Sequence, residues 1–237
     1  MEGIRLQVSY KPFKSFKKEG DDMYVDIREL SYKDKEILRD AQFSFHEGEF
    51  ISILGVNGSG KTSFYRALLG LVNYKGSTDI TRKEIAVVSD YISLPNETPV
   101  VDVRDFIYEH STLTEEIRKL STMLNINDML KTKVHSLSSG QKRKLELLAV
   151  LSSGRKVIIY DEITANIDEP SKNAIISFIK EYHSLHNDSL VFYSSHDLKE
   201  IFQFGGKKLL INPSTKTIEN VTDYSIEDIA MKLSALS

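Results

Sequence analysis

"GVNGSGKT", residues 55–62, is the stretch that decides the fold of this chain. It follows the apolar run "FISIL" (50–54) and precedes "SFYRALLGL" (63–71), whose apolar residues have helical spacing. A buried strand, a glycine-rich turn and a helix in succession are the context that a P-loop requires. We therefore predict that this turn binds the phosphates of a nucleoside triphosphate at the positive end of a helix.

The residue types of the turn suit phosphate chemistry. Its glycines let the backbone adopt positive φ and turn N–H groups toward a phosphate. Lys61 then reaches the β- and γ-phosphates, and Thr62 supplies a hydroxyl group to Mg²⁺. We predict that the nucleotide contacts the following residues: Gly55, Asn57, Gly58, Ser59, Gly60, Lys61, Thr62 and Ser63. The P-loop alone leaves kinases, GTPases, motor proteins and ATPases open.

Composition narrows the class of protein. Thirty-one basic and thirty-four acidic residues give a net charge of -3, so no nucleic-acid partner is expected. The absence of cysteine excludes disulfides, cysteine-ligated zinc, iron–sulfur clusters and thiol catalysis. The apolar runs are far shorter than the roughly 20 residues that cross a bilayer, and the N-terminus lacks the apolar core of a secretory signal. The expected location is the cytoplasm.

The rest of the chain predicts an α/β fold. "MYVDIREL" (23–30) alternates as a strand, and "AQFSFHEGEFISILG" (41–55) adds two apolar stretches, so short antiparallel strands are expected first. From residue 156 on, "KVIIYD", "SLVFYSS" and "KKLLIN" alternate with helical patterns, which favours a mainly parallel sheet covered by helices. A Ser-x-x-Asp pattern at 225–228 predicts the cap of a terminal helix.

Two regions differ from this core. Residues 1–22 are basic and aromatic and are interpreted as an N-terminal extension, either a tail or a membrane-surface or partner-binding arm. Between 100 and 135 the apolar residues have only helical spacing, which indicates a small helical subdomain from about 91 to 150. The expected domain is therefore 23–237, with an antiparallel β subdomain at its start.

"VIIYDE" (157–162) places two acids at the C-terminal end of a buried strand, where open α/β sheets bind their ligands. Asp161 is a candidate for holding Mg²⁺. Glu162, which points the other way, is a candidate for polarising the water that attacks the γ-phosphate. A kinase would instead place its base beside an acceptor hydroxyl group. The pair therefore favours hydrolysis of the triphosphate.

"LSSGQKRK" (137–144) lies between the P-loop and this strand and resembles the signature motif of ATP-binding cassette (ABC) ATPases. Ser139 departs from the family pattern Leu-Ser-Gly-Gly-Gln at the third position, whereas Ser138, Gly140 and Gln141 match it. The resemblance implies that this signature lies far from the ATP of its own subunit and completes the site of a second subunit. All four residues are therefore expected to bind nucleotide.

Other stretches are similar to the same family from residue 23 to about 212. Tyr32 matches the aromatic residue that stacks on adenine. "ANID" (165–168) matches the D-loop, in which Asp168 would sense the other subunit. His196 in "SSHD" matches the switch histidine that contacts the γ-phosphate and steadies the attacking water, so Glu162 and His196 are the expected catalytic pair.

Asp90 departs from the family, which usually carries glutamine after a strand such as "IAVVS" (85–89). A carboxylate can still accept a hydrogen bond from Mg²⁺-bound water, so Asp90 joins Thr62 and Asp161 as a predicted metal-site residue. The following "YISLPNETPVVDV" (91–103) would line the cleft where, in the family, a helix of the membrane subunit docks.

The resemblance implies an ATP-binding and ATP-hydrolysing subunit with Mg²⁺, which forms a homodimer on binding ATP. It powers a permease on a separate chain and lies on the inner face of the cell membrane. The short helical insert resembles that of bacterial exporters for peptides, antibiotics or envelope molecules. Two alternatives stay open: a cytosolic ABC ATPase not coupled to transport, and a non-hydrolysing subunit gated by ATP.

Overall fold

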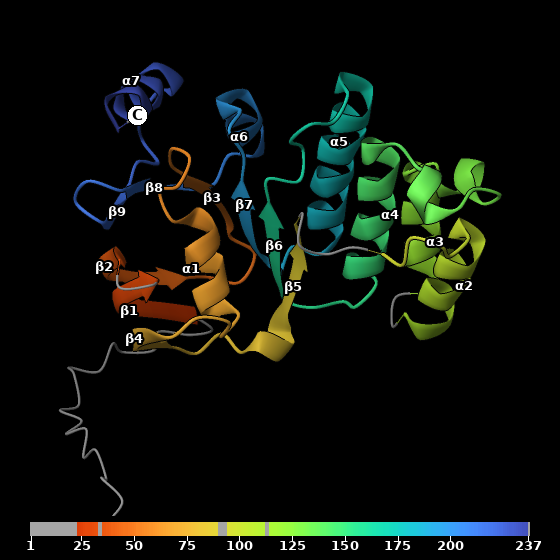
Figure 1. Cartoon of the computed structure of the whole chain (residues 1–237), viewed down its shortest axis with the longest axis horizontal. Helices are drawn as coiled ribbons and strands as arrows, with labels where there is room; N and C mark the ends of the chain where they lie inside the picture. Colours follow the sequence, from red (N-terminus) through yellow and green to blue (C-terminus); the bar gives the residue numbers. More distant parts are fainter. Residues whose placement is uncertain (1–22, 33–34, 90–93, 112–113, 237) are drawn as a thin grey trace, which may run out of the picture.

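The structure is a computed structural model that describes residues 23–32, 35–89, 94–111 and 114–236 (Figure 1). The predicted extension at 1–22 and the predicted metal-site residue Asp90 lie outside the described residues. Among the described helices, none combines the length and the apolar character needed to cross a membrane.

The strands and helices alternate as the sequence predicts in the C-terminal half. The strands are β1 (Met23–Tyr32), β2 (Lys35–Phe45), β3 (Phe50–Leu54), β4 (Tyr74–Thr78), β5 (Ile85–Val88), β6 (Val157–Asp161), β7 (Leu190–Ser194), β8 (Lys207–Asn212) and β9 (Thr217–Asn220). The α-helices are α1 (Lys61–Leu68), α2 (Val100–His110), α3 (Thr114–Met123), α4 (Ser139–Leu151), α5 (Glu169–Leu185), α6 (Leu198–Phe204) and α7 (Ile226–Leu236).

The central sheet has the strand order β5-β6-β7-β3-β8-β9, and all its pairs are parallel except β8 with β9. Both of its faces are covered at the centre, so β3, β6 and β7 are buried on both sides. In β6, Val157 and Ile159 pack toward α1 and the smaller sheet, whereas Ile158 and Tyr160 pack toward the helices on the other face. The carboxyl ends of β3, β6 and β7 therefore meet at one edge of a rigid sheet.

The smaller sheet has the order β2-β1-β4 and is antiparallel. The expectation that all the early strands are antiparallel was wrong for β3, which is paired in parallel with β7 and β8. The third strand of the small sheet is β4 instead. Its sequence, Tyr74–Thr78, has no buried residue, so the apolar pattern gave no signal for it. The order places β3 in the middle of the core, directly before the P-loop.

The helices between β5 and β6 belong to the region assigned to a helical subdomain. α2, α3 and α4 lie together at the end of the molecule away from β1, β2 and β4 (Figure 1). Buried leucines of α4, such as Leu148, pack in the same apolar cluster as Ile179 of α5. The residues of α1, such as Phe64, pack on the opposite face of the sheet. The subdomain boundaries at about 91 and 150 stay a prediction.

The predicted cap of α7 is present, since the hydroxyl of Ser225 accepts a hydrogen bond from the Asp228 N–H group and donates one to its carboxylate. We expect Ser225→Ala to lower the free energy of unfolding by about 1 kcal/mol, because the first turn then loses its acceptor. Urea denaturation measures this change. Ser234→Ala, an exposed position in the same helix, is the matched control. Equal stability of the two variants would contradict the capping role.

Candidate functional site

The P-loop turn leads from the end of β3 into α1 with the backbone that its glycines permit. Gly58 has φ 75° with open space around it, and Gly60 has φ 112° at the N-cap of α1. A Cβ atom at Gly60 would also collide with the Cγ2 methyl of Ile37. The hydroxyl of Ser59 is buried against Gly55. The turn therefore needs glycine at 60 both for its conformation and for its packing.

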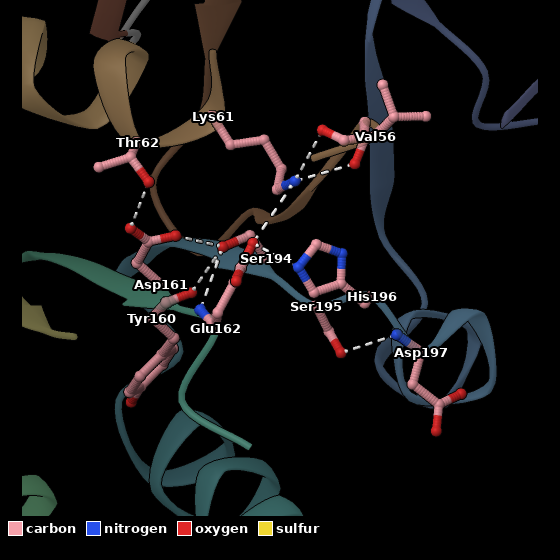
Figure 2. A network of polar contacts seen from close by, with 11 residues as sticks. Val56, Lys61, Thr62, Tyr160, Asp161, Glu162, Ser194, Ser195, His196 and Asp197 are labelled. Atoms are coloured by element: carbon pink, nitrogen blue, oxygen red, sulfur yellow. Dashed lines mark hydrogen bonds and ion pairs between the residues drawn. The ribbon is translucent and has the colours of Figure 1, made fainter. Parts of the chain in front are cut away.

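Lys61 is almost fully buried, and its ammonium group is held over the turn. It donates hydrogen bonds to the carbonyl oxygens of Gly55, at 2.8 Å, and Val56, at 3.4 Å. The same nitrogen lies 3.4 Å from Oε1 of Glu162. Figure 2 shows this ammonium group directed toward the ends of β6 and β7. The positive charge is thus fixed at the point where the turn and the two acids meet.

Asp161 ends β6 and is held by two hydroxyl groups. Ser194 Oγ donates to Oδ1 at 2.8 Å, and Thr62 Oγ1 donates to Oδ2 at 3.1 Å. Burial raises the pKa of Asp161, because desolvation disfavours its charged form. A buried carboxylate beside a P-loop hydroxyl is a donor set that suits Mg²⁺, an ion that prefers oxygen ligands.

Glu162 leaves the strand in the left-handed region, with φ 52°. Its N–H group donates to the Ser194 carbonyl oxygen at 3.1 Å, which fixes this turn against the end of β7. The turned backbone directs the carboxylate to His196, with 2.9 Å between Oε1 and Nε2. Both side chains are partly open to solvent, at 31% and 45% exposure. A glutamate seldom adopts this conformation, so the surrounding contacts hold the backbone there.

The structure gathers most of the predicted nucleotide residues around this edge. Tyr32 is 47% exposed and lines a cavity of about 660 Å³ together with Thr62 and Asp161. Ser63 lines a smaller recess beside Tyr32. Asn57 and Gly55 line a third cavity of about 520 Å³ with His196. Lys61, Thr62, Asp161, Glu162 and His196 form one polar group (Figure 2).

The signature residues lie elsewhere, at the start of α4. Ser138 caps the helix, accepting from the Gln141 N–H group while its own N–H group donates to the Gln141 side chain. Ser139 Oγ donates to the Asn166 carbonyl oxygen at 3.1 Å. Gly140 packs so closely on Ser171 of α5 that a Cβ atom would have to displace it. Since α4 and α1 cover opposite faces of the sheet, the signature is joined to the 165–168 loop rather than to its own P-loop.

Asp168 serves as the N-cap of α5, with the Ser171 N–H group donating to its carboxylate at 3.0 Å. This backbone hydrogen bond lowers the pKa of Asp168. The predicted D-loop therefore connects Glu162 to the start of α5. Asn166, four residues after Glu162, accepts the hydrogen bond from the Ser139 hydroxyl of the signature. That Asp168 senses a second subunit stays a prediction.

Sequence reasoning missed one residue at the centre of the site. Ser194 donates to Asp161, and its carbonyl oxygen accepts from the Glu162 N–H group. A signal for it existed, because Asp161 and Ser194 are register partners at the ends of the neighbouring parallel strands β6 and β7. A polar residue closing the strand beside "VIIYDE" was the feature to look for.

Comparison with known proteins places the chain in a family. The profile of the ABC transporter family matches residues 38–165, more than half of the chain. The chain is 27% identical to the energy-coupling factor transporter ATP-binding protein EcfA1 of Mycoplasma pneumoniae over 202 residues, with 77% of this chain and 73% of the relative covered. It is also 27% identical to the probable peptide export ATP-binding protein YydI of Bacillus subtilis, with 77% of this chain and 87% of the relative covered.

Solved structures agree on the fold. An ATP-binding subunit of an ABC transporter superposes with a TM-score of 0.75 at 16% identity, covering 91% of this chain and all of that one. A metal-chelate type ABC transporter in an inward-facing conformation superposes with a TM-score of 0.74 at 19% identity, covering 91% of this chain and 89% of that one. The predicted P-loop α/β fold, with a mainly parallel sheet and a small antiparallel one, is confirmed. The chain therefore belongs to the ABC transporter family, as one of its ATP-binding and ATP-hydrolysing proteins.

Proposed function

We propose that this chain hydrolyses Mg²⁺-ATP with Glu162 as the general base and powers a permease that is a separate polypeptide. The observation that carries the proposal is the meeting of four side chains at one sheet edge: Lys61, Asp161, Glu162 and His196. A cation for phosphates, an acid for a metal and a histidine-bound carboxylate are the parts that triphosphate hydrolysis uses.

Glu162 and His196 act on the attacking water. The carboxylate accepts a proton from that water as it attacks, and the partly open cavity beside it admits a water molecule. His196 Nε2 lies 2.9 Å from Oε1 and orients the carboxylate. Lys61 lies 3.4 Å from Glu162 and offsets its charge, and a triphosphate would be a stronger partner for the same ammonium group.

Thr62 and Asp161 would hold the magnesium ion. Among the described residues no cluster of three or more acidic or histidine side chains is suited to hold a metal by itself. The pair Thr62 and Asp161 suits an ion that arrives with its nucleotide. In nucleotide sites Mg²⁺ takes one or two protein oxygens and completes its shell with phosphates and water. Bound there, Mg²⁺ neutralises charge that develops on the phosphates.

Asp161→Asn tests this assignment. Burial disfavours the carboxylate charge, so removing that charge should raise the unfolding temperature of the nucleotide-free protein at neutral pH by roughly 2–4 °C, as about 1 kcal/mol does in a domain of this size. The sign follows from the raised pKa of Asp161. The wild type becomes less stable as the pH rises through the pKa of the folded state, because the buried carboxyl group then becomes charged. In acid this group is neutral, so the wild type and the variant should be equally stable there. The same variant should lose Mg²⁺-dependent ATP binding. Lower stability at pH 7 would contradict the account.

A second copy of the chain supplies what the site lacks. Ser138, Ser139 and Gln141 are exposed at the positive end of α4, a helix of thirteen residues, and nothing in their own subunit presents a phosphate to them. Two chains that face each other would place each signature against the P-loop of the other, which closes two ATP sites around one symmetry axis. The link from Ser139 to Asn166 ties this contact surface to the loop after Glu162.

The names of the relatives support a transport role. They include ATP-binding proteins of an energy-coupling factor transporter, a probable metal transport system of Thermotoga maritima and a probable peptide export system. We place the chain on the inner face of the cell membrane, bound to its permease. Export of a peptide, antibiotic or envelope molecule is the substrate class we favour, supported by the Bacillus subtilis relative, of which the match covers 87%.

Co-purification tests the transport role. Tagged Glu162→Gln protein with ATP, expressed in the native host and solubilised in mild detergent, should recover a multi-spanning membrane protein in stoichiometric amount. Tagged Lys61→Ala protein, in which ATP binding should be weakened, is the matched control that shows how much of the recovery depends on the nucleotide. Recovery of only soluble proteins or ribosomes would contradict transport and support a cytosolic ABC ATPase.

A further inference from the structure

A buried polar network lies beneath the catalytic pair and includes none of the predicted site residues. At its centre is Glu200 of α6, which is only 2% exposed. Its Oε2 accepts hydrogen bonds from Thr164 Oγ1 and Tyr193 OH, each at 2.8 Å, and its Oε1 lies 2.8 Å from the ammonium group of Lys172. Burial and the carboxylate of Glu200 raise the pKa of Tyr193, so its hydroxyl stays a donor. Both oxygens of this carboxylate therefore have a named partner.

The network holds the loop that carries His196. Lys172 of α5 also donates to Asp197 Oδ2 at 2.7 Å. Asp197 in turn caps α6 through the Lys199 N–H group, and its own N–H group donates to Ser195 Oγ at 3.0 Å, as Figure 2 shows. His196 thus stands between two residues whose positions are fixed by hydrogen bonds. Hydrogen bonding to Lys172 lowers the pKa of Asp197.

The network also holds the loop that follows Glu162. Thr164 lies two residues beyond Glu162, and its hydroxyl is committed to Glu200. A cavity of about 180 Å³ is lined by both catalytic side chains and by Lys172, Asp197 and Glu200. The charged network is therefore one wall of the space next to the reacting groups. The loop after β6 contacts the buried carboxylate of Glu200 through Thr164, and the loop after β7 contacts it through Asp197 and Lys172.

We propose that Lys172 and Glu200 are positioning residues, which lock the Glu162 loop to the His196 loop and so set the geometry of the general base. The proposal rests on the proposed function, since it concerns the same hydrolytic site. Neither residue belongs to the P-loop or to the signature motif. Their effect is on the rate of the chemical step, because a small misplacement of a base costs rate without costing substrate affinity.

Lys172→Met tests the proposal in the full-length protein. We expect kcat for ATP hydrolysis to fall roughly 10- to 100-fold, while KM and the Kd for ATP stay within about twofold. Lys180→Met is the matched control, since Lys180 lies on the same helix and is exposed, with contacts to Gln203 at 3.4 Å and to the ring of Phe204. Lys172→Arg, which keeps the charge and can reach both carboxylates, should recover most of the rate.

A second variant separates positioning from folding. Lys172→Met leaves Glu200 buried without its cation, so its thermal unfolding is compared with that of the double variant Lys172→Met/Glu200→Gln, in which the buried charge is gone. Recovery of the unfolding temperature with hydrolysis still low supports positioning. If the unfolding temperature and the rate of hydrolysis recover together, or if KM rises with kcat unchanged, the positioning role is overturned. Wild-type protein that hydrolyses no ATP would refute the proposed function itself, whatever the variants do.

Discussion

Glu162→Gln should lower the rate of ATP hydrolysis by about 10²–10⁴-fold and leave ATP binding intact. The amide keeps the shape of the side chain and its contact with His196, but it cannot take the proton of the attacking water. The change also removes the negative charge 3.4 Å from Lys61, so the affinity for the triphosphate should be equal or higher. Phosphate release and equilibrium binding of ATP measure the two effects separately.

Glu181→Gln is the control for this experiment, because Glu181 lies in α5 and its side chain is exposed. That variant should hydrolyse ATP at the wild-type rate. With ATP present, the Glu162→Gln protein should accumulate as a dimer, since the closed state forms but is not resolved by hydrolysis. Hydrolysis by Glu162→Gln equal to that of the wild type would remove Glu162 from its assigned role.

Lys61→Ala should weaken ATP binding by roughly 10- to 150-fold, the loss expected for one hydrogen bond to a charged group of 1.5–3 kcal/mol. The physical reason has two parts. The phosphates lose the buried ammonium group at the turn, and Glu162 is left as an uncompensated negative charge beside them. Titration with ATP measures the dissociation constant. Lys75→Ala, which removes an exposed lysine of β4, should bind as the wild type does, and an unchanged constant for Lys61→Ala would contradict its role.

The sequence predicted the parts of the fold that depend on local pattern. The inner strands of the central sheet are buried on both faces, so runs such as Val157–Asp161 stand out as apolar stretches. The cap at Ser225 follows from two residues three positions apart. The strands β4 and β9 were not predicted, because they lie at sheet edges and carry no buried residues. These strands form because they pair with β1 and β8, and a short stretch of sequence holds no information about its pairing partner.

The same distinction explains the site. Lys61, Asp161 and Glu162 were predicted from the sequence because each belongs to a short motif with its own chemistry. Ser194 and Glu200 were not found, since a lone serine and a helical glutamate are ordinary residues until the fold brings them to Asp161 and Lys172. Contacts between residues distant in sequence carry this information.

The signature shows both cases in one motif. Its resemblance to the family identified Ser138 and Gln141, and the structure adds their mutual capping hydrogen bonds. The departure at Ser139 gains a physical meaning only in three dimensions, where its hydroxyl reaches the Asn166 carbonyl oxygen. A glycine there would leave the loop after Glu162 without this tie to α4.

The claim that two chains share each ATP site is tested most directly by mixing two inactive variants. Lys61→Ala disables the P-loop of one chain, and Ser138→Arg disables the signature of the other, so each variant alone forms no complete site. A mixed dimer pairs the intact P-loop of the second chain with the intact signature of the first. Random pairing makes half of the dimers mixed with one of two sites complete, so the mixture should regain roughly a quarter of the wild-type rate. A mixture no more active than its separate components would contradict the shared site.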